Sequence, residues 1–232
     1  MLFRLIVATV LFFNVLHAFE TTNVQILYSN NFKGDSFIYD TVDGKKTTLT
    51  FEHYRTFSLG DFYMFVDVMD GEKFDGSKHE VYTEIDPRFS LSKISNANLS
   101  FSIIKDVYIA TQLNSGYDYT AYLGGLGVDF DLPYFIYFTL NAYYKSDNFE
   151  NDTYQITPAY KTVDYKNIHF EGFMDITSRD FNTQNQLLYN LSSLFPTKEK
   201  IYLGTEWIYY KYNHNGRSSK TDTFQVMFKY EF

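Results

Sequence analysis

The chain has 232 residues, enough for one large domain or two small ones. Its formal net charge of −8 argues against nucleic acid as a partner, because phosphate binding requires a surface rich in Lys and Arg, and the lack of cysteine excludes disulfides and thiolate zinc sites. Aromatic residues make up 20% of the chain, yet its mean hydropathy is only −0.28. Rings combined with so many polar residues are typical of strands that separate lipid from water.

Residues 1–18 are predicted to be a signal peptide. Arg4 supplies a positive charge, an almost wholly apolar run extends from Leu5 to Leu16, and cleavage is expected after Ala18. The run is too short and wrongly flanked to be a membrane span, and no later apolar run reaches about 18 residues. We therefore expect an exported protein in which residues 19–232 form one domain.

Twelve segments of alternating apolar and polar residues follow, each near the ~10 residues that a tilted membrane-spanning strand needs. In chain order they are 23–31, 46–57, 60–68, 80–91, 105–114, 118–130, 134–146, 151–161, 166–177, 183–192, 200–213 and 220–232. The connections at one end include long polar stretches, and those at the other end include tight turns. The long ones are 33–45, 69–79, 147–150 and 214–219, and the tight ones are 58–59, 131–133 and 162–165.

One connection and the last strand differ from the rest of this pattern. The stretch 91–104 is long where a tight turn is expected, and we predict only that it forms a packed periplasmic loop. The last strand places its rings, from Phe224 to Phe232, on one face and polar residues such as Lys229 on the other. Such a strand at a sheet edge would aggregate, and a closed barrel avoids this by pairing it with the first strand.

The predicted fold is therefore all-β, a transmembrane antiparallel β-barrel of 12 strands with short periplasmic turns and longer extracellular loops. The terminal Phe resembles that of bacterial outer-membrane barrels, so we expect the barrel-assembly machinery to recognise the C-terminal strand. A soluble β-sandwich or a lipocalin-like barrel is the alternative, but either needs only about eight strands.

The alternation of apolar and polar residues also predicts which side chains face the lumen. On the third and fourth strands the apolar residues face lipid, so the acids, Arg88 and the rings of Tyr63, Phe65 and Tyr82 project inward. Such charges either form ion pairs that brace the barrel, as Arg88 with Glu84 or Asp86 would, or contact a solute. The same reasoning sends inward Glu52, Lys145, His169, Glu171, Phe173, Asp175 and Glu206, and leaves His53 and Arg55 on the lipid face, snorkelling to the interface or marking a bulge.

Several motifs resemble those of the Tsx family of nucleoside-specific outer-membrane channels. The fourth strand, Val81-Tyr-Thr-Glu-Ile-Asp-Pro-Arg-Phe-Ser90, matches the family's E-I-[DE]-P-R-F-S strand. Asn96-Ala-Asn-Leu-Ser-Phe101, Tyr122-Leu-Gly-Gly-Leu-Gly-Val-Asp129 and Leu140-Asn-Ala-Tyr-Tyr-Lys145 match later segments in the family's order. The resemblance covers essentially the mature chain, its specific part is 81–145, and OmpK-type receptors share it. It implies a bacterial outer-membrane location.

The resemblance implies a monomeric channel for facilitated diffusion of nucleosides through a narrow aromatic and acidic lumen, without a cofactor. In the family the outer loops also bind phages or colicins, and here those loops are shorter. Rings would stack the base, and carboxylates or amides would hold the ribose weakly. The family match also places an aromatic binding residue at Phe32, for which an ordinary interface ring is the alternative. The predicted solute contacts are Phe32, Lys33, Glu52, Asp61, Asp67, Glu84, Asp86, Arg88, Glu171 and Asp175.

The sequence leaves alternatives to a nucleoside channel. A general small-solute porin, or a surface receptor or structural barrel with a closed pore, fits the same scaffold. An outer-membrane phospholipase would need a Ser–His pair on the lipid-facing surface, but His79 and His214 fall in predicted loops and no G-x-S-x-G element is present. No metal-ligand spacing occurs either, and the acidic stretch 70–75 is expected to be a solvated loop tip.

Overall fold

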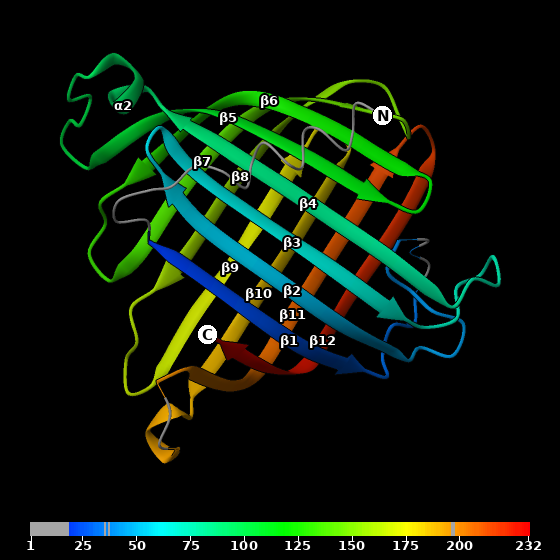
Figure 1. Ribbon diagram of the computed structural model, residues 1–232. Helices are drawn as coiled ribbons and strands as arrows, with labels where there is room; N and C mark the ends of the chain where they lie inside the picture. The colour runs from blue at the N-terminus through cyan, green and yellow to red at the C-terminus, as the bar shows by residue number, and fades with distance from the viewer. Residues whose placement is uncertain (1–18, 35, 37, 196–197) are drawn as a thin grey trace, which may run out of the picture.

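The computed structural model describes residues 19–34, 36, 38–195 and 198–232, and the predicted signal peptide, 1–18, lies outside them (Figure 1). Twelve antiparallel strands form a single sheet that closes on itself, because β1 (Glu20–Ser29) pairs with β12 (Arg217–Glu231). This confirms the predicted barrel and its closure by the last strand. No helix in the described part of the chain is long and apolar enough to cross a membrane.

The other strands follow the predicted segments closely. They are β2 (Lys46–Phe57), β3 (Gly60–Asp70), β4 (His79–Ser90), β5 (Ile104–Gly116), β6 (Tyr119–Phe130), β7 (Phe135–Asp147), β8 (Thr153–Thr162), β9 (Ile168–Thr177), β10 (Asp180–Asn190) and β11 (Lys200–His214). Each pairs with its neighbours in chain order. We call the end that holds Glu20 and Glu231 the terminal end, and the opposite end, which holds the connection 30–45, the loop end; they lie at the left and right of Figure 1.

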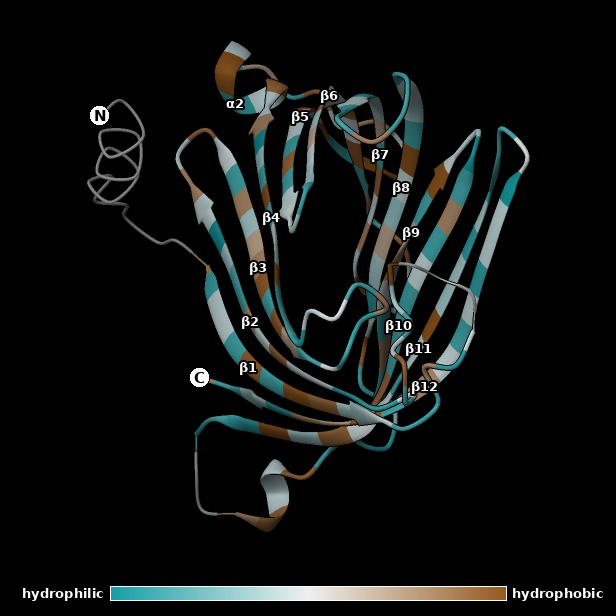
Figure 2. Cartoon of the chain, turned by 90° about the vertical axis from the view of Figure 1, so that its right-hand side faces the viewer, coloured by the Kyte–Doolittle hydropathy of each residue, from teal (hydrophilic) through white to brown (hydrophobic). Residues whose placement is uncertain are grey.

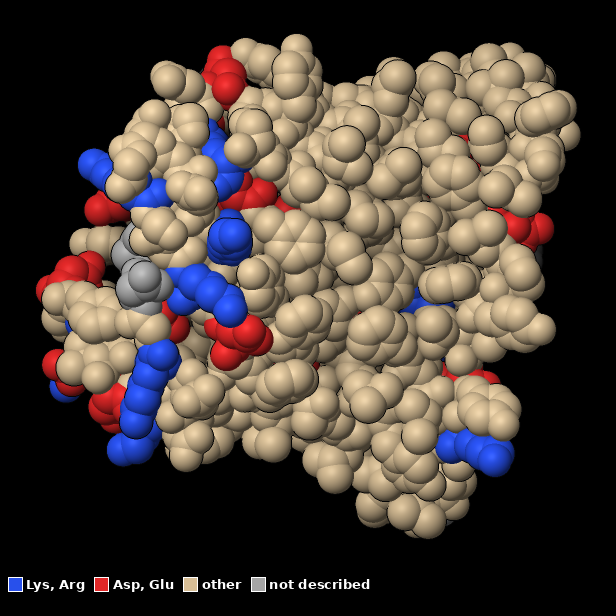
Figure 3. All heavy atoms as spheres, turned by 180° about the vertical axis from the view of Figure 1, so that it is seen from behind, with Lys and Arg blue, Asp and Glu red and all other residues tan. Residues whose placement is uncertain are grey.

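Alternation along each strand separates an outer wall from a lumen. On β12 the side chains of Phe224, Val226 and Phe228 are exposed, whereas those of Gln225 and Lys229 are buried inside the barrel. Along the strands the hydropathy alternates in the same way (Figure 2). On the face seen in Figure 3, Lys, Arg, Asp and Glu gather toward the two ends and leave a nearly uncharged belt between them. An apolar belt of this kind is what a lipid bilayer requires of a barrel.

Two apolar clusters fill opposite corners of the lumen. One joins Leu27, Leu188, Tyr202 and Met227, from β1, β10, β11 and β12. The other joins Ala110, Ala121, Leu123 and Tyr143, from β5, β6 and β7. Polar side chains face the lumen between and around these corners, and the acids predicted to contact a solute come from β2–β4 on one side and β9 on the other.

One predicted long loop is wrong. The stretch 214–219 contains only a two-residue turn at Asn215 and Gly216, since β11 continues to His214 and β12 begins at Arg217. Both turn residues have positive φ, 51° and 74°, which is the type I′ geometry that Asn-Gly favours between twisted strands. The polar residues in this stretch belong to the strands themselves, because the barrel extends beyond the belt.

The stretch 91–104 is not the packed loop that we expected. It starts with a short helix, α2 (Leu91–Ser95), capped by the Ser90 hydroxyl, which accepts the backbone N–H of Lys93. None of the helix residues is buried, and Phe101 beyond it is 77% exposed. Polar bonds at its base hold the stretch instead, because the hydroxyls of Ser90 and Ser92 both donate to Asp106, each at 2.6 Å.

Candidate functional site: the lumen

The acids predicted to face the lumen all do so, but their surroundings differ. Asp61, Glu84 and Glu171 are buried among partners, and four others remain partly accessible: Glu52, Asp67, Asp86 and Asp175. Exposure alone does not distinguish the acids that brace the walls from those that could meet a solute, because Glu52 is partly accessible and yet paired with Lys229. The hydrogen bonds and ion pairs of each acid make that distinction.

Arg88 belongs to a brace, with partners other than the predicted ones. Its guanidinium donates to both carboxylate oxygens of Asp61, at 2.8 and 2.7 Å, and to Asp129 at 2.8 Å, and it lies 4.3 Å from the ring centre of Tyr108. The expected partners, Glu84 and Asp86, are on the same strand as Arg88. Arg88 pairs with Asp61 instead because the two residues lie directly opposite each other across the β3–β4 ladder, where side chains approach most closely.

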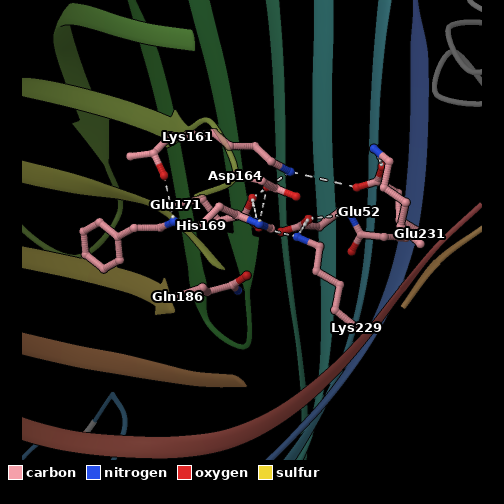
Figure 4. Close-up of polar contacts among 12 residues, drawn as sticks. Glu52, Lys161, Asp164, His169, Glu171, Gln186, Lys229 and Glu231 are labelled. Atoms are coloured by element: carbon pink, nitrogen blue, oxygen red, sulfur yellow. Dashed lines mark hydrogen bonds and ion pairs between the residues drawn. The ribbon is translucent and has the colours of Figure 1, made fainter. Parts of the chain in front are cut away.

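A second brace crosses the lumen near the terminal end (Figure 4). The Lys229 ammonium on β12 lies 3.3 Å from Glu52 on β2 and also bonds Glu171 on β9. Glu171 is in turn 2.9 Å from Lys161 and 3.3 Å from Nε2 of His169. The network therefore ties β12, β2, β8 and β9 together from inside, and it confirms that Lys229 and His169 face inward.

The wall formed by β3, β4 and β5 carries a different kind of group at mid-height. Glu84 accepts hydrogen bonds from the Tyr82 hydroxyl, at 2.6 Å, and from the amide of Gln112, at 2.7 Å. Asn114, directly opposite Glu84 on β5, is 3% exposed, and its Oδ1 has no hydrogen-bond partner among the described residues. Asp86 also has one carboxylate oxygen, Oδ1, without a described partner. Buried oxygens of this kind are costly unless something donates to them.

Aromatic rings lie beside these oxygens. Tyr63 is directly opposite Asp86 in the β3–β4 ladder, and the ring centres of Tyr63, Phe65 and Tyr82 follow one another at 6.2 and 5.9 Å. Tyr63 and Tyr82 are only half-buried. The sequence placed these rings inward without counting them among solute contacts; the signal was that they share a face with the predicted acids. We call Tyr63, Tyr82, Glu84, Asp86 and Asn114 the mid-lumen patch.

The facing wall, β7–β9, is also acidic at this level. Asp175 accepts from the amide of Gln155, at 2.9 Å, and from the hydroxyl of Thr157, at 2.7 Å. Lys145 donates to Oε1 of the Gln155 side chain at 3.1 Å. On β2 and β3, Thr50 donates to Asp67 at 2.5 Å. Carboxylates thus line both sides of the space between the walls, each held in place by uncharged donors.

Phe32 and Lys33, the predicted contacts at the outer mouth, are placed differently from each other. Phe32 is fully buried, with the Lys46 ammonium 3.7 Å from its ring centre. Lys33 is exposed, and its stem lies against Gly44 in the same loop. Phe32 is therefore neither an interface ring nor open to the lumen, because its side chain is fully enclosed by the described residues around it.

The connection 30–45 folds back over the loop end and contributes a residue that the sequence did not indicate. The Tyr39 hydroxyl donates to Asn182 at 3.0 Å, and its ring lies 5.5 Å from that of Tyr210, so the loop reaches from β1 across to β10 and β11. Burial raises the pKa of the Tyr39 phenol, which keeps it a neutral donor. Asp40 anchors the loop by accepting from the Thr221 hydroxyl on β12 at 3.3 Å.

The barrel is similar to known outer-membrane proteins in fold and in sequence. The solved KdgM porin superimposes with a TM-score of 0.52 at 14% identity, over 91% of this chain and 99% of that one, which supports the fold alone. The nucleoside-specific channel-forming protein Tsx of Klebsiella pneumoniae is 29% identical over 112 residues, 41% of this chain. The outer membrane protein OmpK of Vibrio parahaemolyticus is 28% identical over 128 residues, 50% of this chain.

The chain spans 38% of the length of that Tsx relative and 49% of the OmpK relative. Their similarity assigns the chain to the bacterial outer membrane. Because outer-membrane barrels carry their longer loops outside, we infer that the longest connection, 30–45, is extracellular and that the terminal end faces the periplasm. The model of the family described as "Nucleoside-specific channel-forming protein, Tsx" matches residues 28–214. Because that match covers most of the chain, the protein belongs to the Tsx family.

Proposed function

We propose that this barrel is a channel through which nucleosides cross the outer membrane by facilitated diffusion. The observation that carries the proposal is the mid-lumen patch, where half-buried rings lie beside oxygen atoms that lack a donor. Family membership supplies the class of solute. The patch supplies surfaces suited to the two halves of that solute, a flat base and a ribose rich in hydroxyls.

The chemistry of each half follows from the atoms present. Ribose hydroxyls donate to the carboxylate of Asp86, which is partly accessible and whose Oδ1 has no partner among the described residues. The base packs against the rings of Tyr63 and Tyr82, an interaction worth about 1–3 kcal/mol for a base on an aromatic side chain. Contacts of this strength suit a channel, since a solute must enter readily and still leave.

The charges of the lumen favour uncharged solutes over phosphorylated ones. Carboxylates line both walls, with Asp67 and Asp86 on one and Asp175 on the other. Nearby basic residues such as Arg88 and Lys229 are already paired with acids. Lys145 instead donates to the uncharged side chain of Gln155, but the three carboxylates outnumber it. A phosphate passing this level would therefore meet an excess of like charge, whereas an uncharged nucleoside would not. Glu52, Asp61, Arg88 and Glu171 are better explained as braces than as solute contacts.

Liposome swelling tests the proposal against its alternatives. Proteoliposomes containing the barrel should admit adenosine faster than a sugar of equal size. Equal rates for both would support a general small-solute porin instead. No permeation of either would support a closed barrel, in which Tyr39 and its loop seal the outer mouth.

A further inference from the structure

The outer wall carries a groove at the terminal end, beside the turns that join β6 to β7 and β8 to β9. Its volume is about 420 Å³, within the range of roughly 300–1,000 Å³ that small-molecule sites occupy. Aromatic and aliphatic side chains form most of its walls, chiefly Phe135, Val163, Ile168, Phe170 and Leu187. This groove is outside the barrel and separate from the lumen patch.

A local break in the β8–β9 ladder creates the groove. Regular pairing ends at Lys161 and Glu171, and the next N–H, that of Phe170, bonds the Thr162 hydroxyl at 2.9 Å. Val163 then leaves the sheet, and its N–H bonds the carbonyl of Tyr134 in the neighbouring turn at 2.9 Å. The strands meet again only at the bridge between Tyr165 and Ile168. The resulting gap opens toward the lipid-facing side, where Ile168 and Leu187 are exposed.

Away from the terminal end, the groove is bounded by Tyr160, which is held by ring contacts and a hydrogen bond within the wall. Tyr160 packs its ring against Phe170, with ring centres 5.5 Å apart, and edge-on against Phe135 at 6.5 Å. Its hydroxyl bonds the buried side chain of Asn185 across Gly172, which lies between them in the sheet. A side chain at Gly172 could not be accommodated, because its Cβ would lie 2.3 Å from the carbonyl oxygen of Gln184.

A lysine and an aspartate lie at the β8–β9 turn beside the groove. Lys166, at the tip of the β8–β9 turn, is exposed, and its ammonium lies 5.4 Å from the ring centre of Tyr165, which lines the groove. Asp164 lines the groove as well, and its Oδ1 is 3.1 Å from Nδ1 of His169. An amphiphile in the groove would thus place its apolar part against Phe170 and its head group near Lys166.

We propose that the groove binds one phospholipid of the inner leaflet, with an acyl chain between Phe135 and Leu187 and the phosphate on Lys166. The groove is continuous with the lipid-facing belt and lies at the periplasmic end, where the surrounding amphiphiles are phospholipids. A lysine near a membrane surface contributes about 1 kcal/mol toward binding an anionic lipid, which corresponds to roughly a fivefold change in affinity. The apolar fit accounts for the rest.

Native mass spectrometry of the detergent-solubilised protein, titrated with palmitoyl-oleoyl phosphatidylglycerol, tests the proposal. The wild type should retain one lipid after collisional removal of detergent, and Leu187→Trp, which fills the groove, should lose it. Leu203→Trp, which adds the same ring at an exposed position on the neighbouring β11, is the matched control and should retain the lipid. Equal retention by both variants, or none by the wild type, would overturn the proposal.

A second pair of variants tests whether Lys166 binds the phosphate of the lipid. Lys166→Gln should weaken retention about fivefold, whereas Lys105→Gln, another exposed lysine at the terminal end, should not. If diacylglycerol, which lacks phosphate, is retained as strongly as the phospholipid, the role of Lys166 is wrong. Folding of every variant is checked by heat-modifiable migration on gels, and Ile168→Trp from the opposite wall replaces Leu187→Trp should that variant fail to fold.

Discussion

Some residues of this lumen brace the walls and others are proposed to contact the solute. The alternation of apolar and polar residues cannot distinguish the two roles. It assigns a side chain to a face, and it did so correctly for Glu52, Asp86 and Arg88. It does not say which side chain across the sheet will be the partner, because that depends on register. Arg88 illustrates the limit, since its carboxylates come from β3 and β6. The rings of Tyr63 and Tyr82 became candidate contacts only once the register set them beside free oxygens.

Arg88 should be essential for stability. Replacing it by Met leaves the carboxylates of Asp61 and Asp129 buried without a counter-charge, so we expect the free energy of unfolding to fall by about 3–5 kcal/mol in urea titrations. Lys45→Ala removes an exposed partner of Asp43 and should leave the unfolding midpoint unchanged. Adding Asp61→Asn and Asp129→Asn to Arg88→Met should recover part of the loss. A loss below about 1 kcal/mol would show that Arg88 is not a brace.

Asp86 should matter for the solute more than for the fold. Asp86→Ala removes an acceptor whose Oδ1 has no described partner, so we expect the affinity for adenosine to fall roughly tenfold while heat-modifiable folding is kept. Asp131→Ala, in the exposed turn between β6 and β7, is the matched control. The measurement is the adenosine concentration that halves the ion current. An unchanged value for Asp86→Ala would remove this residue from the proposed contacts.

The strands could be predicted wherever apolar and polar residues alternate along the sequence. The bounds of β2 match the prediction, and most other strands differ from it by one to three residues at their ends. The connections were harder, because turn chemistry and side-chain caps decide them. Asn215-Gly216 makes a tight turn that the polar residues around it concealed, and Ser90 and Ser92 organise the stretch after β4 through Asp106. The inward fold of the connection 30–45 depends on partners from β10 to β12, which no local pattern reveals.

That connection should set the width of the outer mouth. Tyr39→Ala removes the ring that reaches Tyr210 and the hydroxyl that bonds Asn182, so we expect a higher single-channel conductance with unchanged barrel stability. Tyr39→Phe keeps the ring and should change conductance much less. Equal conductance for the wild type and Tyr39→Ala would show that the ring does not narrow the ion path.

At the scale of the whole molecule, closure and strand number followed from the sequence, whereas the shape of the lumen did not. The pairing of β1 with β12 is what a terminal strand with one apolar face requires. The lumen is shaped by two packed corners, and in one of them Leu27 of β1 meets Leu188 of β10, from strands far apart in the chain. A long-range contact of this kind cannot be read from alternation, since each residue alone looks like any inward side chain.

The central claim is that nucleosides pass through this lumen and contact it on the way. Planar-bilayer recordings of the purified barrel, with and without adenosine, test the claim most directly. We expect a measurable ion current that adenosine reduces in a saturable, concentration-dependent manner, while ribose alone reduces it less, because the rings of Tyr63 and Tyr82 contact the base. A current that adenosine does not alter would contradict nucleoside binding in the lumen, and the absence of any current would contradict an open channel.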